Sequence, residues 1–372
     1  MKIELVKSRT QRVGRILFAV LICFILSCSA QAQIDWSGRF YEQVMVYTGA
    51  SQDQKFAACL GVSILDLGLD VRPSDLLRVR GEIEFAFTYP DTASLPGTGG
   101  VDIASINTLN ATITPGRTKI TIGRFLPRWG VCQVFRPLDL FTPQLYFLNM
   151  LSFKGVDGIS VKYYLSDLSS FEVMTVPASQ LRHSTTAANA ELHAGTFDCN
   201  LIFLYDGSTT DKVLGLALKG DLILGVAGEL YYGFRDTMDY WDTNTLFKAS
   251  VGLDYSFAKY FFVSAGYFYD ESGKSDYNDY VLLNPTSRMT LGTQYLEGSF
   301  IFRSFTDMTI GLGSIFNLND KSFVIYPYFQ NEIFENCQLG ISLYHFNGPA
   351  GREFSDSLMG NYVFNTYLLV RF

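Results

Sequence analysis

The stretch LLRVRGEIEFAFTYP, residues 76–90, alternates charged and apolar side chains over most of its length. One parity carries four charged residues, which are Arg78, Arg80, Glu82 and Glu84. The other parity carries Val79, Gly81, Ile83, Phe85 and Phe87. A period of two residues predicts a β-strand with one polar and one apolar face. Four charges on one face need water or partners. The polar interior of a transmembrane barrel supplies both, whereas a soluble sheet would turn them outward.

Segments with the same alternation recur along the chain. We expect strands at 35–48, 56–72, 76–89, 101–113, 118–130, 151–164, 170–178, 188–196, 198–206, 212–219, 222–234, 245–257, 260–270, 288–303, 308–319, 322–333, 337–347 and 361–372. Short turns such as RPSD and TPGR alternate with long connections such as YPDTASLPGTGG, a habit of outer-membrane barrels. The predicted fold class is all-β, a single antiparallel transmembrane β-barrel.

The strand count depends on NAELHAGTFDCNLIFLYDG, residues 189–207. This stretch is either one strand or two strands folded at Gly195-Thr196. A chain that enters and leaves the barrel on one side needs an even number of strands. The sequence therefore predicts 16–18 strands, with eighteen as the best count.

The first 32 residues differ from the rest. Five Lys and Arg residues precede the apolar run 16–26, and Ala30-Gln31-Ala32 follows it. This order predicts a cleaved signal peptide, residues 1–32, before one barrel domain, residues 33–372. Two alternatives are an uncleaved membrane anchor, for which the run is short, and lipidation at Cys28.

The composition narrows the classes of partner. Charged residues make up 17% of the chain, below the roughly 25% of soluble domains, and aromatic residues reach 15%. Without residues 1–32 the chain has 24 basic and 35 acidic residues, a net charge of −11, which argues against nucleic acid as a partner. The remaining cysteines, at 59, 132, 199 and 337, form no C-x-x-C pair and so suggest no metal or redox motif. Buried or lipid-facing free thiols are favoured over one or two disulfides.

The chain ends in NYVFNTYLLVRF, residues 361–372. Apolar residues at alternate positions share the parity of the final Phe372, among them Leu368 and Val370. The stretch resembles the C-terminal signature of bacterial outer-membrane barrels. The resemblance implies that the barrel-insertion machinery reads Phe372, Val370 and Leu368. It also implies the bacterial outer membrane as the location and outer-membrane lipid as a partner.

A second stretch, ITIGRFLPRWGVCQVFRPLDLFTP, spans residues 120–143. It has Gly123-Arg124, then Trp129-Gly130, then Pro137-x-Asp139. The stretch resembles a segment in porin-like proteins of the alginate-export and phosphate-selective-porin type, where such loops fold into the channel. Val131-Cys132 replaces small polar residues, and Arg136 stands where Asn is common. The polyanion specificity of those porins is therefore not carried over.

The resemblance implies an in-folded charged loop, residues 131–149, that shapes a pore. Arg78, Arg80, Glu82, Glu84, Arg124, Arg128, Arg136 and Asp139 are the expected pore-lining or constriction residues. Either a bulge at Gly123 turns Arg124 and Arg128 inward, or both lie above the lipid. The alternative for the whole loop is a salt-bridged element that only stiffens the barrel.

We expect a porin-like channel through which small hydrophilic solutes diffuse passively. The alternatives are a barrel that acts through its surface loops, as an adhesin or structural protein, and a transporter of hydrophobic molecules. The three histidines, at 183, 193 and 345, form no catalytic motif, so we expect no enzyme activity, no metal and no cofactor. A homotrimer is one assembly that the sequence leaves open.

Overall fold

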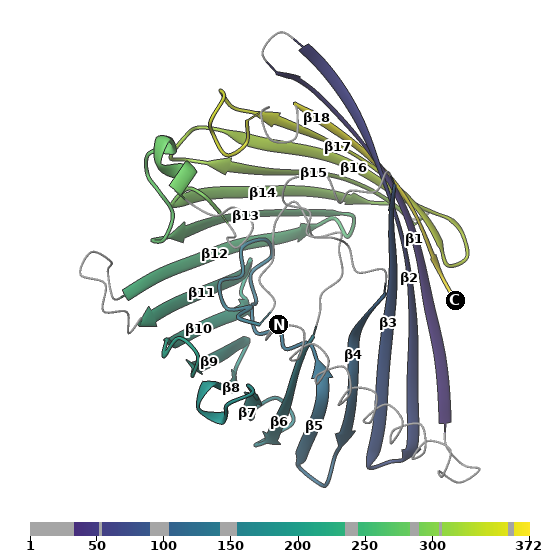
Figure 1. Ribbon diagram of the computed structural model, residues 1–372, viewed down its shortest axis with the longest axis vertical. Coiled ribbons are helices and arrows are strands. Elements are labelled where there is room, and N and C mark those ends of the chain that lie inside the picture. Colours follow the sequence, from purple (N-terminus) through teal and green to yellow (C-terminus); the bar gives the residue numbers. More distant parts are fainter. Residues whose placement is uncertain are drawn as a thin grey trace, which may run out of the picture.

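The computed structural model describes residues 33–51, 54–89, 104–141, 155–234, 245–282, 290–304, 307–355 and 361–372. Its 18 strands form one antiparallel sheet that closes on itself, because β1 pairs with both β2 and β18 (Figure 1). The predicted all-β barrel and its best count of eighteen strands are confirmed. The expected signal peptide, residues 1–32, lies outside the described residues.

The strands follow one another around the ring in chain order. The first nine are β1 Gln33–Ser51, β2 Gln54–Ser74, β3 Leu77–Tyr89, β4 Ala104–Ile113, β5 Thr118–Phe125, β6 Val156–Tyr164, β7 Ser170–Val176, β8 Thr185–Ala194 and β9 Phe197–Asp206. The second nine are β10 Lys212–Asp221, β11 Gly225–Phe234, β12 Thr245–Phe257, β13 Phe261–Asp270, β14 Gln294–Arg303, β15 Met308–Asn317, β16 Phe323–Phe334, β17 Cys337–Asn347 and β18 Tyr362–Arg371. Two 3₁₀ helices, Leu181–His183 and Tyr277–Leu282, lie in connections.

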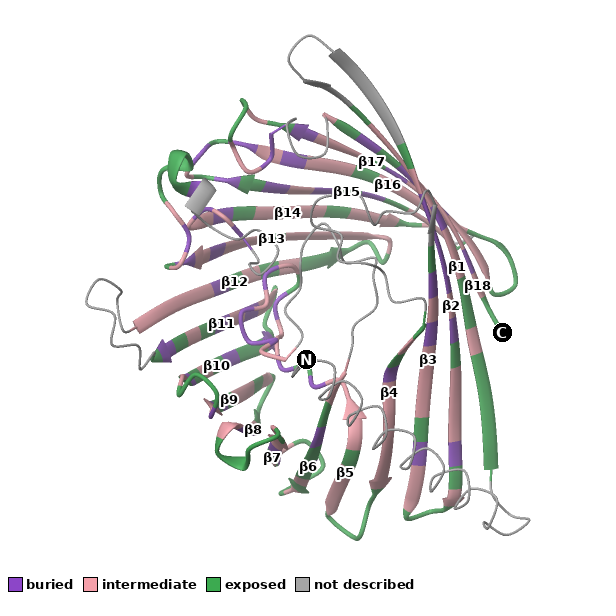
Figure 2. Ribbon diagram, viewed as in Figure 1, coloured by how far each residue is buried: buried purple, intermediate pink, exposed green. Residues whose placement is uncertain are grey.

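The two faces of the wall differ in chemistry. On β6 the exposed Ile159, Val161 and Tyr163 alternate with the buried Ser160. The same alternation of exposed and less exposed residues runs along other strands of the ring (Figure 2). Large apolar side chains that remain exposed on the outer face of a closed barrel are suited to lipid. The opposite face lines the lumen.

Two glycines set strand boundaries that the alternation alone leaves open. Gly195 has φ +67° in the turn between β8 and β9, so the stretch 189–207 is two strands, as the count of eighteen requires. Gly123 has φ +120° near the end of β5. That strand ends at Phe125, so the expected strand 118–130 is too long by five residues.

The barrel closes at the seam between β1 and β18. Gly38 and Phe372 exchange two backbone hydrogen bonds, of 2.7 and 3.0 Å. Leu368 and Val370 lie on the same face as Phe364, whose side chain is exposed, while the alternating Asn365 and Leu369 are buried. The terminal strand therefore places its apolar parity on the outer face.

Among the described residues, no helix is long and apolar enough to cross a membrane. The cysteines at 59, 132, 199 and 337 are free thiols. Only Cys132 of the four is buried.

Candidate functional site in the lumen

The connection between β5 and β6 enters the lumen. Residues 126–141 of this connection are described, and we call them the inner segment. They cross the interior of the ring of strands (Figure 1) and belong to apolar clusters with side chains on the inner faces of β7 to β10 and of β13 to β18. The expected loop 131–149 overlaps the inner segment at 131–141, and its residues 142–149 lie outside the described residues.

Two carboxylates on the inner wall hold the backbone of the inner segment. Glu229 on β11 accepts hydrogen bonds from the backbone N–H groups of Val131 at 2.6 Å, Cys132 at 2.7 Å and Leu138 at 3.0 Å. Glu297 on β14 accepts from the backbone N–H groups of two further residues, Val134 and Phe135. Charge-assisted bonds of this kind are about twice as strong as neutral ones. The two carboxylates therefore fix the segment against one side of the barrel.

Apolar contacts join the inner segment to the wall on both sides of these carboxylates. Trp129 and Leu138 pack in a cluster with inner-face residues of β7 to β10, which are Met174, Ala187, Ile202, Leu204, Val213 and Ala217. Phe135 stacks on Phe268 of β13 with ring centroids 4.5 Å apart. The lumen is therefore not polar throughout, because the inner segment covers an apolar part of the wall.

The Trp-Gly and Pro-x-Asp elements of the quoted motif meet at one carboxylate. Asp139 is buried, and its Oδ1 accepts from the backbone N–H groups of Trp129 at 3.1 Å and Gly130 at 2.9 Å. Arg136 lies 3.8 Å from Asp139 and donates to the carbonyl of Cys132 at 2.6 Å. The structure brings Arg136 and Asp139 together, and both stabilise the turn of the inner segment.

The four charged residues of β3 share the inner face, as their parity predicts. Arg78 pairs with Asp70 of β2, and Arg80 lies 3.4 Å from the same carboxylate. Glu84 is buried and accepts a hydrogen bond from Asn107 at 3.3 Å. The arginine group on β2 and β3 is thus a cluster of its own, close to the turn between these strands.

Arg124 lies on the outer face, which corrects its assignment to the pore. Arg124 forms an ion pair of 2.6 Å with Asp157, its cross-strand partner on β6. This pair lies on the same face of the sheet as the exposed pair Ile122 and Ile159. The ladder continues without a shift through Gly123, so no bulge turns Arg124 inward. Arg128 is exposed within the inner segment.

Sequence reasoning missed Glu229 and Glu297. The sequence does hold a hint of their position, because each glutamate lies on the less apolar parity of its strand. The adjacent leucines, Leu230 in GELYYG and Leu296 in YLEGSF, lie on the opposite, more apolar parity. A carboxylate on the inner parity marks a polar contact, but it does not name its partner. The partners here are backbone N–H groups far away in the chain, which a pattern of side chains does not reveal.

The described residues contain no cluster of three or more His, Cys, Asp and Glu side chains that could hold a metal ion. Several charged side chains of the lumen bind one another, as Arg78 does with Asp70, and Glu229 binds the backbone of the inner segment. This arrangement can filter ions and solutes by charge and width.

Comparison with solved structures finds the same architecture in outer-membrane porins. Pseudomonas aeruginosa OccK11 superposes with a TM-score of 0.59 at 9% identity, covering 92% of this chain and 95% of that one. Salmonella typhi OmpF, solved with daunomycin, gives 0.52 at 14% identity, covering 91% and 97%. Escherichia coli Wzi, an outer-membrane protein involved in group 1 capsule assembly and described as a carbohydrate-binding β-barrel, gives 0.58 at 9%, covering 91% and 84%.

No known family profile matches the chain, and no curated protein is similar to it in sequence. The structural likeness establishes the fold. The large apolar side chains exposed on the outer face of this closed barrel are suited to a lipid bilayer.

Proposed function

We propose that the protein is a porin-like channel through which small hydrophilic solutes diffuse passively, with the inner segment shaping the pore. A barrel of 18 strands is too wide for its wall side chains to fill. The observation that carries the proposal is the anchoring of the inner segment by Glu229 and Glu297. This anchoring thickens the wall from β7 to β14 and narrows the lumen from one side.

We propose that the in-folded loop is a feature that this chain shares with porins of the alginate-export and phosphate-selective type. We propose a common design with those porins, without their polyanion specificity. Here the arginine of the loop, Arg136, binds Asp139 and a backbone carbonyl within the loop itself. Arg128 is exposed in the inner segment, and we propose that its charge contributes to the ion selectivity of the pore.

The test is the reversal potential of the refolded barrel, residues 33–372, across a potassium chloride gradient in a planar bilayer. Arg128→Ala should shift the reversal potential toward cation selectivity, because it removes a positive charge from the pore. Arg124→Ala is the matched control, since its ion pair with Asp157 lies on the outer face. An equal shift in both variants, or none in Arg128→Ala, would contradict the proposal for the inner segment.

The two alternative functions make different predictions. A barrel that acts only through its surface loops would be folded and inserted but would not conduct. A transporter of hydrophobic molecules would need an apolar path. The arginine and carboxylate groups on the inner faces of β2 and β3 argue against such a path.

We also propose that the outer face of β1 and β2 packs against another copy in a homotrimer. Glu42 and Ser63 are hydrogen-bonded partners there, on the same face as the exposed Phe40. A carboxylate that faces lipid is unfavourable, whereas a subunit interface can accept it. Native mass spectrometry in detergent should show trimers of the wild-type protein, and Glu42→Leu should change the fraction of protein that is trimeric. A wild-type protein that is monomeric throughout would exclude this assembly.

For insertion, we propose that the alternating apolar residues of β18, ending in Phe372, are the part that the barrel-insertion machinery reads. Their outer-face position on an end strand suits recognition before the barrel closes. Phe372→Ser should lower the amount of inserted barrel in cells, measured by heat-modifiable migration on gels. Unchanged insertion would contradict this role.

A further inference from the structure

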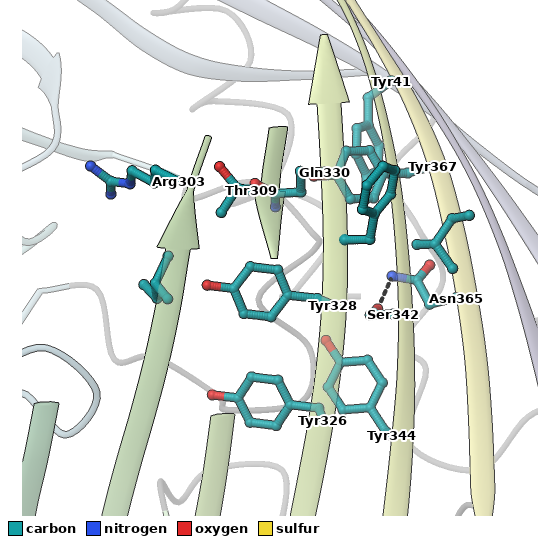
Figure 3. Close-up of a pocket in the computed structure, with 13 residues that line it drawn as sticks. Tyr41, Arg303, Thr309, Tyr326, Tyr328, Gln330, Ser342, Tyr344, Asn365 and Tyr367 are labelled. Atoms are coloured by element: carbon teal, nitrogen blue, oxygen red, sulfur yellow. Dashed lines mark hydrogen bonds between the residues drawn. The ribbon is translucent and has the colours of Figure 1, made fainter. Parts of the chain in front are cut away.

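A hollow lined by tyrosines lies on the inner wall formed by β14 to β18 and β1. Its volume is about 330 Å³, at the lower end of the range for small-molecule sites. We call it the tyrosine hollow. Its tyrosines are Tyr41, Tyr326, Tyr328, Tyr344 and Tyr367, and the polar residues Arg303, Thr309, Gln330, Ser342 and Asn365 lie among and beside them (Figure 3).

Three of the tyrosines are paired across strands with glycines. Tyr326 is opposite Gly313, Tyr328 is opposite Gly311, and Tyr367 is opposite Gly340. A Cβ atom at each glycine would overlap the ring of its tyrosine, so each ring lies over the backbone of the neighbouring strand. Figure 3 shows the ring of Tyr328 above that of Tyr326, both with their faces toward the viewer.

The glycines therefore let the rings lie along the wall instead of standing across the lumen. An aromatic ring in this position offers its π face to a passing molecule. Two pairs of rings extend the surface. Tyr326 and Tyr344 have centroids 5.3 Å apart at an interplanar angle of 24°, and Tyr41 and Tyr367 have centroids 5.3 Å apart at 32°.

The tyrosine hollow continues from the inner segment toward the turn between β14 and β15. Tyr326 and Tyr344 pack against the apolar cluster that contains Phe135 of the inner segment. At the other end, Arg303 and Thr309 flank the β14–β15 turn. A solute that passes the inner segment therefore meets the tyrosines next.

The chemistry of the hollow selects among ligand classes. No carboxylate is present among the described residues that line it, and the positive side chain of Arg303 disfavours a cation. Hydroxyl and amide groups offer both donors and acceptors at the edges of the rings. A ligand that fits has a flat apolar face and a rim of hydroxyl groups.

Building on the proposed channel, we propose that the tyrosine hollow is a binding site for neutral pyranose sugars. The C–H face of the sugar ring packs on Tyr326 and Tyr328, and the hydroxyl groups bond to tyrosine hydroxyls, Gln330 and Thr309. Weak binding of this kind raises the local sugar concentration in the pore and still allows release.

Titration calorimetry with maltose on the refolded barrel in detergent tests the site without requiring an open channel. Maltose should bind, and the double variant Tyr326→Ala, Tyr328→Ala should weaken its affinity by about five- to tenfold, the effect expected for lost aromatic contacts. Tyr163→Ala is the matched control, because this tyrosine is exposed on the outer face of β6. Its affinity should equal that of the wild type.

Two further variants separate stacking from a purely structural role. Tyr326→Phe keeps the ring and should retain most of the affinity. Gly313→Ala keeps the tyrosine but displaces its ring, so it should weaken maltose binding in a barrel that stays folded by heat-modifiable migration. Absence of maltose binding by the wild type, equal affinity in the double variant, or binding of choline instead of maltose would overturn the proposal.

The single-channel current distinguishes this proposal from the proposed channel. An open channel that maltose neither blocks nor binds would leave the porin function standing and remove the sugar site. A silent barrel that binds maltose in calorimetry, with the loss in the double variant, would support the site and contradict passive diffusion.

Discussion

Glu229 is the residue on which the position of the inner segment depends most. It is 1% exposed and accepts three backbone hydrogen bonds from residues about ninety positions earlier in the chain. A buried N–H group that loses its acceptor costs about 1–3 kcal/mol. The carboxylate therefore acts as a structural anchor of the inner segment.

Glu229→Gln should loosen the inner segment. The amide replaces one acceptor oxygen with a donor, which then faces a backbone N–H group. We expect larger and noisier single-channel currents, since the segment no longer stays against the wall. Glu172→Gln on β7 is the control, because this glutamate accepts a hydrogen bond from Ser160 at 2.5 Å, away from the inner segment. Currents that match the wild type in both variants would rule out the anchor.

Gly123 and Gly116 offer a second test at this scale. Both have positive φ, +120° and +60°, but a Cβ on Gly123 would overlap the carbonyl oxygen of Leu109, whereas Gly116 has no atom within 4 Å of that position. Gly123→Ala should lower the free energy of unfolding by about 3 kcal/mol or more, because the backbone must move to make room for the Cβ atom. Gly116→Ala should cost about 1 kcal/mol. The midpoints of urea unfolding in detergent would measure both effects. Equal midpoints for the two variants would contradict the predicted overlap between a Cβ at position 123 and the carbonyl of Leu109.

At the scale of strands and loops, the sequence determines the wall well and the connections poorly. Alternation predicted each of the eighteen strands, since lipid on one side and the lumen on the other impose a period of two. The expected strand 118–130 was too long, because its pairing with β6 ends at Phe125 and the chain, which includes Pro127, then leaves the sheet. The alternation of apolar and polar residues does not reveal such a change in chain direction.

A polar cluster joins three connections on one rim of the barrel. Glu353, between β17 and β18, accepts hydrogen bonds from the backbone N–H of Leu291 at 3.0 Å and from Asn317 at 2.7 Å. The hydroxyl of Tyr295 also donates to Glu353. Burial, reinforced by the nearby Asp320, raises the pKa of Glu353 to about 7.

This raised pKa predicts a pH dependence of the rim. The folded state favours the protonated carboxyl, so the contribution of Glu353 to stability is complete below its ordinary pKa of 4.5 and is lost as the pH rises through about 7. Hydrogen exchange at the amide of Leu291, corrected for the intrinsic rate, should be slower at pH 5 than at pH 8. Glu353→Gln should remove most of this difference. Equal protection at the two pH values in the wild type would contradict the assignment.

At the scale of the whole molecule, the sequence predicted the barrel but only part of the arrangement of residues in its lumen. Arg136 and Asp139 come together because they are near each other in the chain, and the face of Arg78 to Glu84 follows from parity. The outer position of Arg124 depends on whether the ladder shifts at Gly123, which sequence alone does not determine. The anchors Glu229 and Glu297 depend on contacts between distant parts of the chain.

The measurement that tests the central claim most directly is the single-channel current of the refolded barrel, residues 33–372, in a planar bilayer. We predict stable open steps, because the lumen of an 18-stranded barrel is too wide for wall side chains to fill and the inner segment is held against one side of it. A barrel that is folded and inserted, as shown by heat-modifiable migration, yet carries no current would contradict the porin-like channel.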